Sequence, residues 1–172
     1  TGILSESGAL DDSALYTFIS AVFSEFGGEI KRKFVVSCAD VNTGVYHLFN
    51  ETVSDPVKAV VSSASIPFVF PHQIWPNGTS DNPGEDPLVC MDGGTIYNTN
   101  LVSAIERCRE TVDDDKDITL DIIICDSPTL GAWTDQTNAL SNFIRFKEVK
   151  DYYDSLGDIY RFKQAFPDVN YR

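Results

Sequence analysis

A short apolar run that ends in an Asp-Gly-Gly turn does most to constrain the fold of this chain. Residues 88–91 have the length of a strand, Asp92, Gly93 and Gly94 follow directly, and apolar residues return at helical spacing from Leu101. Strand, glycine turn and helix together form the repeating unit of α/β proteins. The sequence therefore predicts an α/β fold with an open, largely parallel sheet flanked by helices.

Other local patterns predict further helices and strands. After Asp11 or Asp12 as N-cap, apolar residues recur at the i, i+3, i+4 spacing of an amphipathic helix, which Gly27-Gly28 ends. Asp55-Pro56 has the chemistry of a helix start, and Pro67 ends that helix. The remaining predictions are a hairpin over 34–49, a loop over 76–87, a strand over 118–125, and two helices around 143–153 and 159–166.

Charge and hydropathy exclude several classes of protein. The 172 residues carry 13 Lys and Arg against 26 Asp and Glu, a net charge of −13. Such a charge repels the phosphates of nucleic acids, so no nucleic-acid partner is expected. No apolar run approaches the roughly 20 residues of a membrane span, so an integral membrane protein is not expected.

The cysteines and two short motifs give opposing indications about the cell compartment. Cys38, Cys90, Cys108 and Cys125 are too few and too widely spaced for a disulfide scaffold or a Cys-x-x-Cys zinc site. Three of them lie in apolar runs, which predicts reduced core thiols and favours an intracellular protein, soluble or peripheral to a membrane. Asn50-Glu51-Thr52 and Asn77-Gly78-Thr79 match the N-glycosylation acceptor pattern and favour the opposite. The compartment stays open.

The start of the chain indicates a longer parent protein. The sequence begins Thr1-Gly2-Ile3-Leu4 without an initiator Met, and its only methionine is Met91. We therefore expect an excised or partial piece of a longer polypeptide.

Three carboxylates follow apolar runs and are candidates for a site. Asp40, Asp92 and Asp126 each come directly after a predicted strand, and ligands of open α/β sheets bind beyond the carboxyl ends of strands. One interpretation is an Mg²⁺ site for phosphoryl chemistry, and another is that Asp92 simply caps the next helix. The acidic run 113–117 lacks the Gly and Glu of a calcium loop and is interpreted as a solvated turn.

Three motifs in the same order carry a family resemblance. They are Cys38-Ala39-Asp40-Val41-Asn42-Thr43-Gly44, the segment from Ser62-Ser63-Ala64-Ser65-Ile66-Pro67 to Phe70-Pro71-His72, and the segment from Asp92-Gly93-Gly94 to Asn100. Together they resemble the patatin-like phospholipase family. The resemblance covers about residues 2–126. It implies an incomplete three-layer α/β/α domain over 1–126, followed by a helical extension over 127–172.

The resemblance also implies an activity and its residues. Members of this family hydrolyse lipid acyl esters with a Ser-Asp dyad, and the aspartate corresponds to Asp92. The turn of the family's aspartate motif corresponds to Gly93, Gly94 and Asn98. The family's substrate cleft corresponds to the segment that ends the preceding helix, namely Ser63, Ala64, Ser65, Pro67 and Phe70. The family's Gly-x-Ser-x-Gly serine turn occurs nowhere in these residues. The serine half is therefore expected in the rest of the polypeptide, and this chain alone is expected to be inactive.

The implied chemistry needs neither a metal nor another cofactor, because backbone N–H groups of the family's oxyanion hole would stabilise the developing charge. Alternatives remain: a catalytically dead structural or lipid-binding piece, the Mg²⁺ site, and a His-based triad with His47 or His72 as base. The histidine reading is disfavoured because no nucleophile elbow lies near either residue. Local peripheral contact with a membrane is expected through apolar side chains of one segment, Phe68, Phe70, Ile74 and Trp75.

Overall fold

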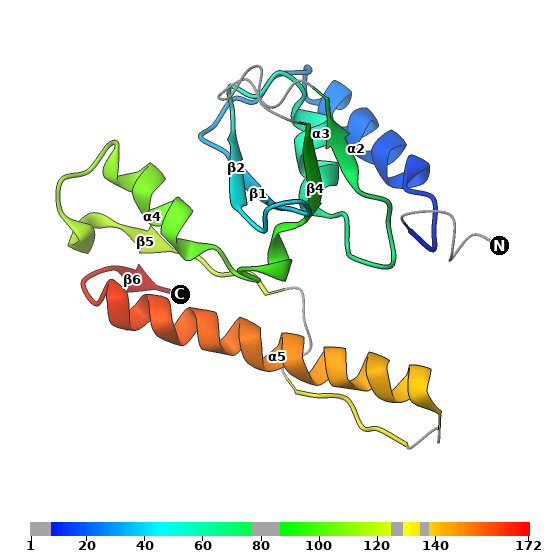
Figure 1. The fold of residues 1–172 in the computed structure, drawn as a ribbon. Helices are drawn as coiled ribbons and strands as arrows, with labels where there is room; N and C mark the ends of the chain where they lie inside the picture. Colours follow the sequence, from blue (N-terminus) through cyan, green and yellow to red (C-terminus); the bar gives the residue numbers. More distant parts are fainter. Residues whose placement is uncertain (1–7, 77–86, 125–128, 135–137) are drawn as a thin grey trace. The chain divides into compact units, whose positions relative to one another are not determined.

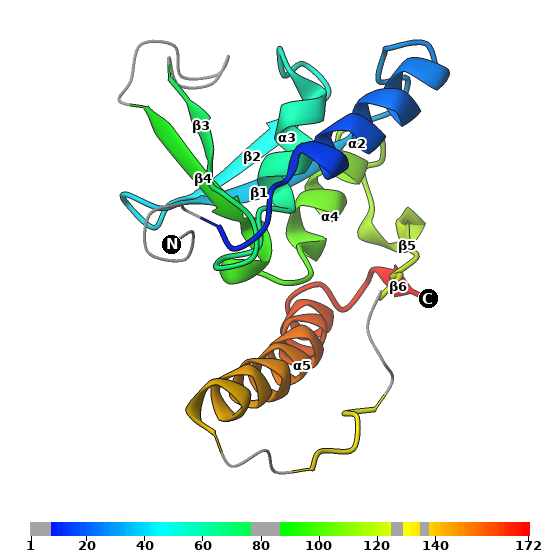
Figure 2. The same cartoon turned by 90° about the vertical axis from the view of Figure 1, so that its right-hand side faces the viewer.

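The computed structural model describes residues 8–76, 87–124, 129–134 and 138–172. The chain forms two compact units, Thr1–Ile96 and Tyr97–Arg172 (Figures 1 and 2). The boundary predicted from the sequence, after residue 126, falls inside the second unit. Each unit is described by itself below.

A four-stranded sheet forms the centre of the first unit. Its strands are β1 (Val35–Asp40), β2 (Tyr46–Asn50), β3 (Gln73–Trp75) and β4 (Leu88–Asp92). They are arranged in the order β2-β1-β4-β3, and every neighbouring pair is antiparallel. The mixed α/β class is confirmed, whereas the prediction of a largely parallel sheet is wrong for this sheet.

The hairpin explains part of this difference. β1 and β2 are joined by a short turn in which Gly44 takes a φ of +74°, a backbone conformation that favours glycine. A turn this short reverses the chain, so the two strands must run antiparallel. β4 then pairs with the other edge of β1, also antiparallel. The strand, glycine turn and helix that begin at Leu88 thus occur without a parallel neighbour for β4 in the described residues.

Two helices accompany the sheet, as the sequence predicted. α2 (Ser13–Glu25) and α3 (Pro56–Ser63) lie on the same side of it, with α3 against β1 and β4 and α2 against α3 (Figures 1 and 2). The Asp55 side chain caps α3 by accepting the Lys58 N–H at 2.9 Å. The core between α3 and the sheet contains Cys38, Phe49, Val53, Ala59, Trp75, Leu88 and Cys90.

The sequence did not predict β3, and this short strand carries a core residue. Trp75 is 5% exposed, stacks on Phe49 with ring centroids 5.0 Å apart, and donates its Nε1–H to Ser62 Oγ at 3.1 Å. The prediction that Trp75 contacts a membrane is therefore wrong. Phe68 and Ile74, from the same predicted group, are exposed.

Cys38 and Cys90 are joined by a disulfide that connects β1 to β4, with Cα atoms 5.4 Å apart. Both residues are fully buried. The prediction of reduced thiols is wrong for this pair, because antiparallel pairing brings together two cysteines that lie 52 positions apart in the sequence. Cys108 is a free cysteine, and Cys125 lies outside the described residues.

The second unit consists of α4 (Leu101–Arg109), β5 (Thr119–Leu120), α5 (Ala139–Ala165) and β6 (Asn170–Tyr171), and β5 pairs parallel to β6. The prediction of a strand over 118–125 is wrong for the described part of that range, where only Thr119–Leu120 form a strand, because the partner β6 supplies only two residues. The two predicted C-terminal helices are one helix, α5, which continues through Gly157. The core contains Leu101, Ile105, Ile118, Leu120 and Val169.

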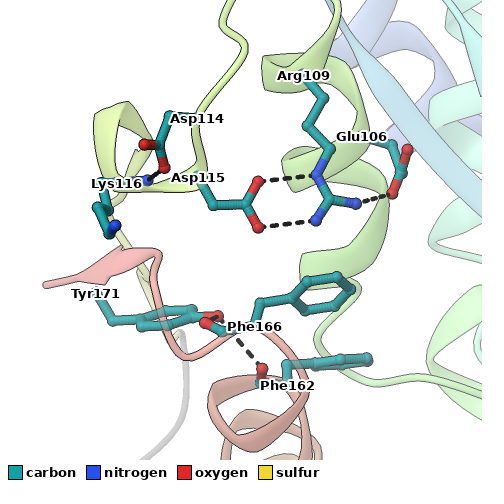
Figure 3. Close-up of polar contacts among 8 residues, drawn as sticks. All are labelled: Glu106, Arg109, Asp114, Asp115, Lys116, Phe162, Phe166 and Tyr171. Carbon is teal, nitrogen blue, oxygen red and sulfur yellow. Dashed lines mark hydrogen bonds and ion pairs between the residues drawn. The ribbon is translucent and has the colours of Figure 1, made fainter.

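An arginine organises the acidic turn of this unit (Figure 3). Arg109 donates two hydrogen bonds to the Asp115 carboxylate, at 2.9 and 2.8 Å, and a third to Glu106 at 2.6 Å. Its guanidinium also lies 5.1 Å from the centre of the Phe166 ring. These bonds from Arg109 lower the pKa of Asp115. The acidic run is thus partly an ion-paired structure, and its interpretation as a purely solvated turn was incomplete.

Candidate active site

Asp92 lies at the end of β4, where the chain turns out of the sheet. Its N–H donates to the Ser65 carbonyl at 2.9 Å, and its Oδ1 accepts the Gly94 N–H at 2.7 Å. The other carboxylate oxygen, Oδ2, accepts no hydrogen bond from the described residues. Desolvation by burial raises the pKa of Asp92 and outweighs the opposite effect of the Gly94 bond. A carboxylate with a raised pKa and one free oxygen is suited to accept a proton.

The turn after Asp92 packs against β1 at a distance that only glycine allows. Gly93, Gly94 and Thr95 form a short 3₁₀ turn, and Gly93 is buried. A Cβ atom added to Gly93 would lie 2.7 Å from the Ser37 carbonyl oxygen and would also meet Ser37 Oγ. That hydroxyl oxygen accepts a hydrogen bond from the Tyr46 hydroxyl at 2.7 Å. Contact with β1 therefore fixes the backbone beside Asp92.

Gly93→Ala is expected to destabilise the fold by about 1–3 kcal/mol, the usual cost of forcing extra atoms into a packed site. The Ser37 backbone cannot move away without disturbing β1, so removing the Ser37 side chain should not rescue the variant. Gly131→Ala is the matched control, since nothing lies within 4 Å of a Cβ added there. Urea unfolding of both variants measures the effect, and equal stability of the two would contradict the packing argument.

The segment after α3 brings the second motif to Asp92. Ser65 is buried, its hydroxyl donates to the Val61 carbonyl at 2.8 Å, and its own carbonyl accepts the Asp92 N–H. Ser62 is buried too. The other predicted cleft residues have varied exposure: Ser63, Ala64 and Phe70 are partly buried, and Pro67 is exposed.

A strained turn follows at Pro67. The Val69 N–H donates to the Ile66 carbonyl at 3.0 Å, and Phe68 takes a φ of +73°. Pro followed by a residue at positive φ is the geometry of a type II turn, in which the second position usually holds glycine. Phe68 occupies that position and is 63% exposed. An exposed aromatic residue thus has an unfavourable backbone conformation, and such strained residues are enriched at functional sites.

Asn98, the last predicted motif residue, belongs to the second unit and bonds to α5. Its N–H donates to Asp158 Oδ2 at 3.1 Å, and its Nδ2 donates to Ser155 Oγ. Ser155 and Asp158 are both buried, and sequence reasoning missed them. No local signal marked them, because the surrounding helix carries many other polar residues, such as Asp151, Asp154 and Arg161.

Asp40 has a structural role that its strand-end position did not indicate. Its Oδ1 accepts the Asn42 and Val89 N–H groups at 3.2 and 3.4 Å, and its Oδ2 accepts the Thr43 N–H at 3.2 Å and the Thr43 hydroxyl at 2.5 Å. Desolvation by burial raises the pKa of Asp40, but these hydrogen bonds together lower it by more. Its carboxylate oxygens are therefore occupied by the chain itself.

The predicted row of strand-end carboxylates is not assembled in the described residues. β1 pairs antiparallel with β4, so Asp40 lies opposite Cys90 and Asp92 lies opposite Cys38. The disulfide joins one diagonal of this group, and the two aspartates occupy the other corners. Asp126 lies outside the described residues. No group of three His, Cys, Asp or Glu side chains that could hold a metal occurs in the described part of the chain.

Asp40→Asn is expected to lower the free energy of unfolding at pH 7 by about 1–3 kcal/mol, because it removes hydrogen bonds to a charged acceptor. The pKa of folded Asp40 lies below its ordinary value of 3.8. The contribution of the carboxylate is thus fully present above that value and is lost as the pH falls through the lower, folded-state pKa. Urea unfolding from pH 7 down to pH 3 should show the difference shrinking, and a constant difference would contradict this role.

Neither histidine forms a triad in the described part of the chain. His47 lies in β2 opposite Cys38, and His72 lies just before β3. No hydrogen bond joins either imidazole to a described serine. A cavity in the second unit, lined by Trp133, Arg145 and Tyr152 among others, contains none of the predicted site residues.

The described residues therefore assemble a small site from Asp92, the Gly93–Thr95 turn and the Ser65 carbonyl, with the exposed Phe68 ring on the same segment as Ser65. No helix in the described ranges combines the length and apolar character needed to cross a membrane. No protein-family model matches this sequence, and no curated protein matches it.

Proposed function

We propose that this chain is part of a patatin-like serine acyl hydrolase and supplies the aspartate of its Ser-Asp dyad. The observation that carries the proposal is the hydrogen bond from the Asp92 N–H to the Ser65 carbonyl, since it links two of the three motifs on which the resemblance rests. The proposed substrate is an ester-linked acyl lipid.

The proposed reaction follows from the state of the Asp92 carboxylate. A serine hydroxyl is a weak nucleophile until a neighbouring base accepts its proton. Asp92 Oδ2 would accept that proton while the Gly94 N–H holds Oδ1 in place. The serine oxygen attacks the acyl carbon, and Asp92 returns the proton to the departing alcohol. Water then releases the fatty acid by the same route. In this proposal the serine and the oxyanion-hole N–H groups come from the rest of the polypeptide.

The finer fold prediction also becomes a proposal. We propose that the antiparallel sheet is the edge of a larger three-layer α/β/α domain whose remaining strands carry the serine. The uncovered apolar surface of α2 supports this, because Phe18 and Val22 are 63% and 37% exposed, and Phe26 at the end of the helix is 67% exposed. Residues of this kind normally face a core. A further layer from the same polypeptide would cover them.

The test is ester hydrolysis by the complete parent protein and by this chain alone. We expect the parent to hydrolyse a phospholipid and a short-chain ester and to react covalently with a fluorophosphonate, which labels activated serines. The isolated chain should do neither. A parent that binds lipid vesicles but neither hydrolyses nor reacts would favour the catalytically dead lipid-binding protein. Activity that EDTA abolishes would favour a metal-dependent hydrolase.

A further inference from the structure

We propose that Asn50 is an acceptor for an N-linked glycan. Asn50 is the last residue of β2, and Asn50-Glu51-Thr52 has the sequence of an acceptor site. The sequence motif alone arises often by chance. Two structural observations, one at the motif and one in the core, support the modification. Neither depends on the proposed hydrolase activity.

The first observation is the geometry of the motif. Asn50 Oδ1 accepts the Thr52 N–H at 2.8 Å and the Thr52 hydroxyl at 2.7 Å. The hydroxyl that defines the motif is thus already in contact with the carboxamide that would be modified. The carboxamide nitrogen, Nδ2, donates to none of the described residues. It is the atom to which the sugar would be attached.

The position of the turn leaves room for a glycan. β2 is an edge strand of the four-stranded sheet, and Thr52 is exposed. The Val53 N–H donates to the Asn50 carbonyl at 3.1 Å, and the Val53 side chain is 8% exposed. The turn is therefore anchored on its inner side by Val53, while Asn50 is partly buried and Thr52 is exposed.

The second observation is the buried Cys38–Cys90 disulfide. Disulfides form and persist in oxidising compartments such as the secretory pathway and are rare in the cytosol. Asparagine glycosylation belongs to the same pathway. The disulfide therefore supports passage of this chain through an oxidising compartment, which is where Asn50 would be modified.

The transfer reaction balances with a lipid-linked donor. A polyprenyl diphosphate oligosaccharide supplies the sugar. A bond forms between Asn50 Nδ2 and the anomeric carbon of the oligosaccharide, and the bond from that carbon to the diphosphate oxygen breaks. Polyprenyl diphosphate leaves, and one Nδ2 proton passes to a base of the transferase.

The experiment expresses the complete parent protein through the secretory pathway of a eukaryotic cell, with a cleavable signal sequence that ensures entry. Peptide-N-glycosidase F should remove a mass increase and leave aspartate at position 50, identified by peptide mapping of the unmutated protein. Asn77→Gln serves as the background for the variants, because Asn77 heads the other motif seen in the sequence. In that background, Asn50→Gln and Thr52→Val should abolish the glycan, whereas Thr52→Ser should retain it.

The result that overturns the proposal is a secreted parent protein with an oxidised Cys38–Cys90 pair and an unmodified Asn50. A glycan found on Asn77 alone would also overturn it. Because the decisive measurement is made on the unmutated protein, a variant that fails to fold does not remove the test. Ester hydrolysis is not a readout here, so failure of the proposed activity leaves this result intact.

Discussion

Asp92→Asn in the complete parent protein is expected to lower the rate of ester hydrolysis by roughly 10²–10⁴-fold, the usual contribution of a general base. Asparagine keeps the size of the side chain and can still accept the Gly94 N–H, but it cannot take a proton from serine. The measurement is the hydrolysis rate of a phospholipid and of a short-chain ester, with EDTA and with added Mg²⁺. Near-parental activity of the variant would contradict the dyad, and recovery with Mg²⁺ would indicate a metal site instead.

The stability of the same variant provides a control with a defined sign. Folding raises the pKa of Asp92 above its ordinary value of 3.8, so the folded protein disfavours the charged carboxylate. Stability contributed by this group is therefore present below 3.8 and is lost as the pH rises through the folded-state pKa. Asp92→Asn should consequently unfold at the same or a higher temperature than the parent at pH 7. Asp40→Asn should behave oppositely at that pH, since the pKa of Asp40 is lowered.

Replacing Cys38 and Cys90 together by alanine is expected to reduce the free energy of unfolding by about 4 kcal/mol. The disulfide closes a loop with a sequence separation of 52, and the estimate comes from the chain entropy that this closure removes from the unfolded state. Domains of ordinary stability have a free energy of unfolding of about 5–15 kcal/mol, so the variant would lose a large share of its stability. Chemical unfolding of the parent protein with and without a reducing agent measures the same effect independently.

Cys108→Ala is the matched control for that experiment. Cys108 is a free, partly exposed cysteine, so its replacement should change stability far less. Titration of free thiols in the denatured, unreduced protein should find Cys38 and Cys90 unreactive. If Cys38 and Cys90 react, or if the double alanine variant and Cys108→Ala lose equal stability, the two cysteines are reduced core thiols, as the sequence predicted.

The sequence by itself determined the local elements of this protein. α3 starts where Asp55-Pro56 predicts, α2 ends next to Gly27-Gly28, and the hairpin and β4 occupy the predicted residues. Each depends on groups within a few positions of one another, such as a capping carboxylate and the N–H three residues later. The Asp-Gly-Gly turn belongs to this class, because a strand followed by two glycines is visible without any tertiary contact.

Only the tertiary structure decided how these elements combine. The antiparallel order of the sheet, the Cys38–Cys90 disulfide and the burial of Trp75 all depend on strands that meet across long stretches of sequence. α5 continues through Gly157 although glycine costs a helix about 1 kcal/mol. Hydrogen bonds from outside the helix, such as the one that the Asn98 N–H donates to Asp158, stabilise it there. The opposite pKa shifts of Asp40 and Asp92 likewise depend on how the elements pack. Both aspartates end a strand, but Asp40 accepts N–H groups from its own turn and from β4, whereas at Asp92 a single bond from Gly94 is too weak to cancel the effect of burial on the pKa.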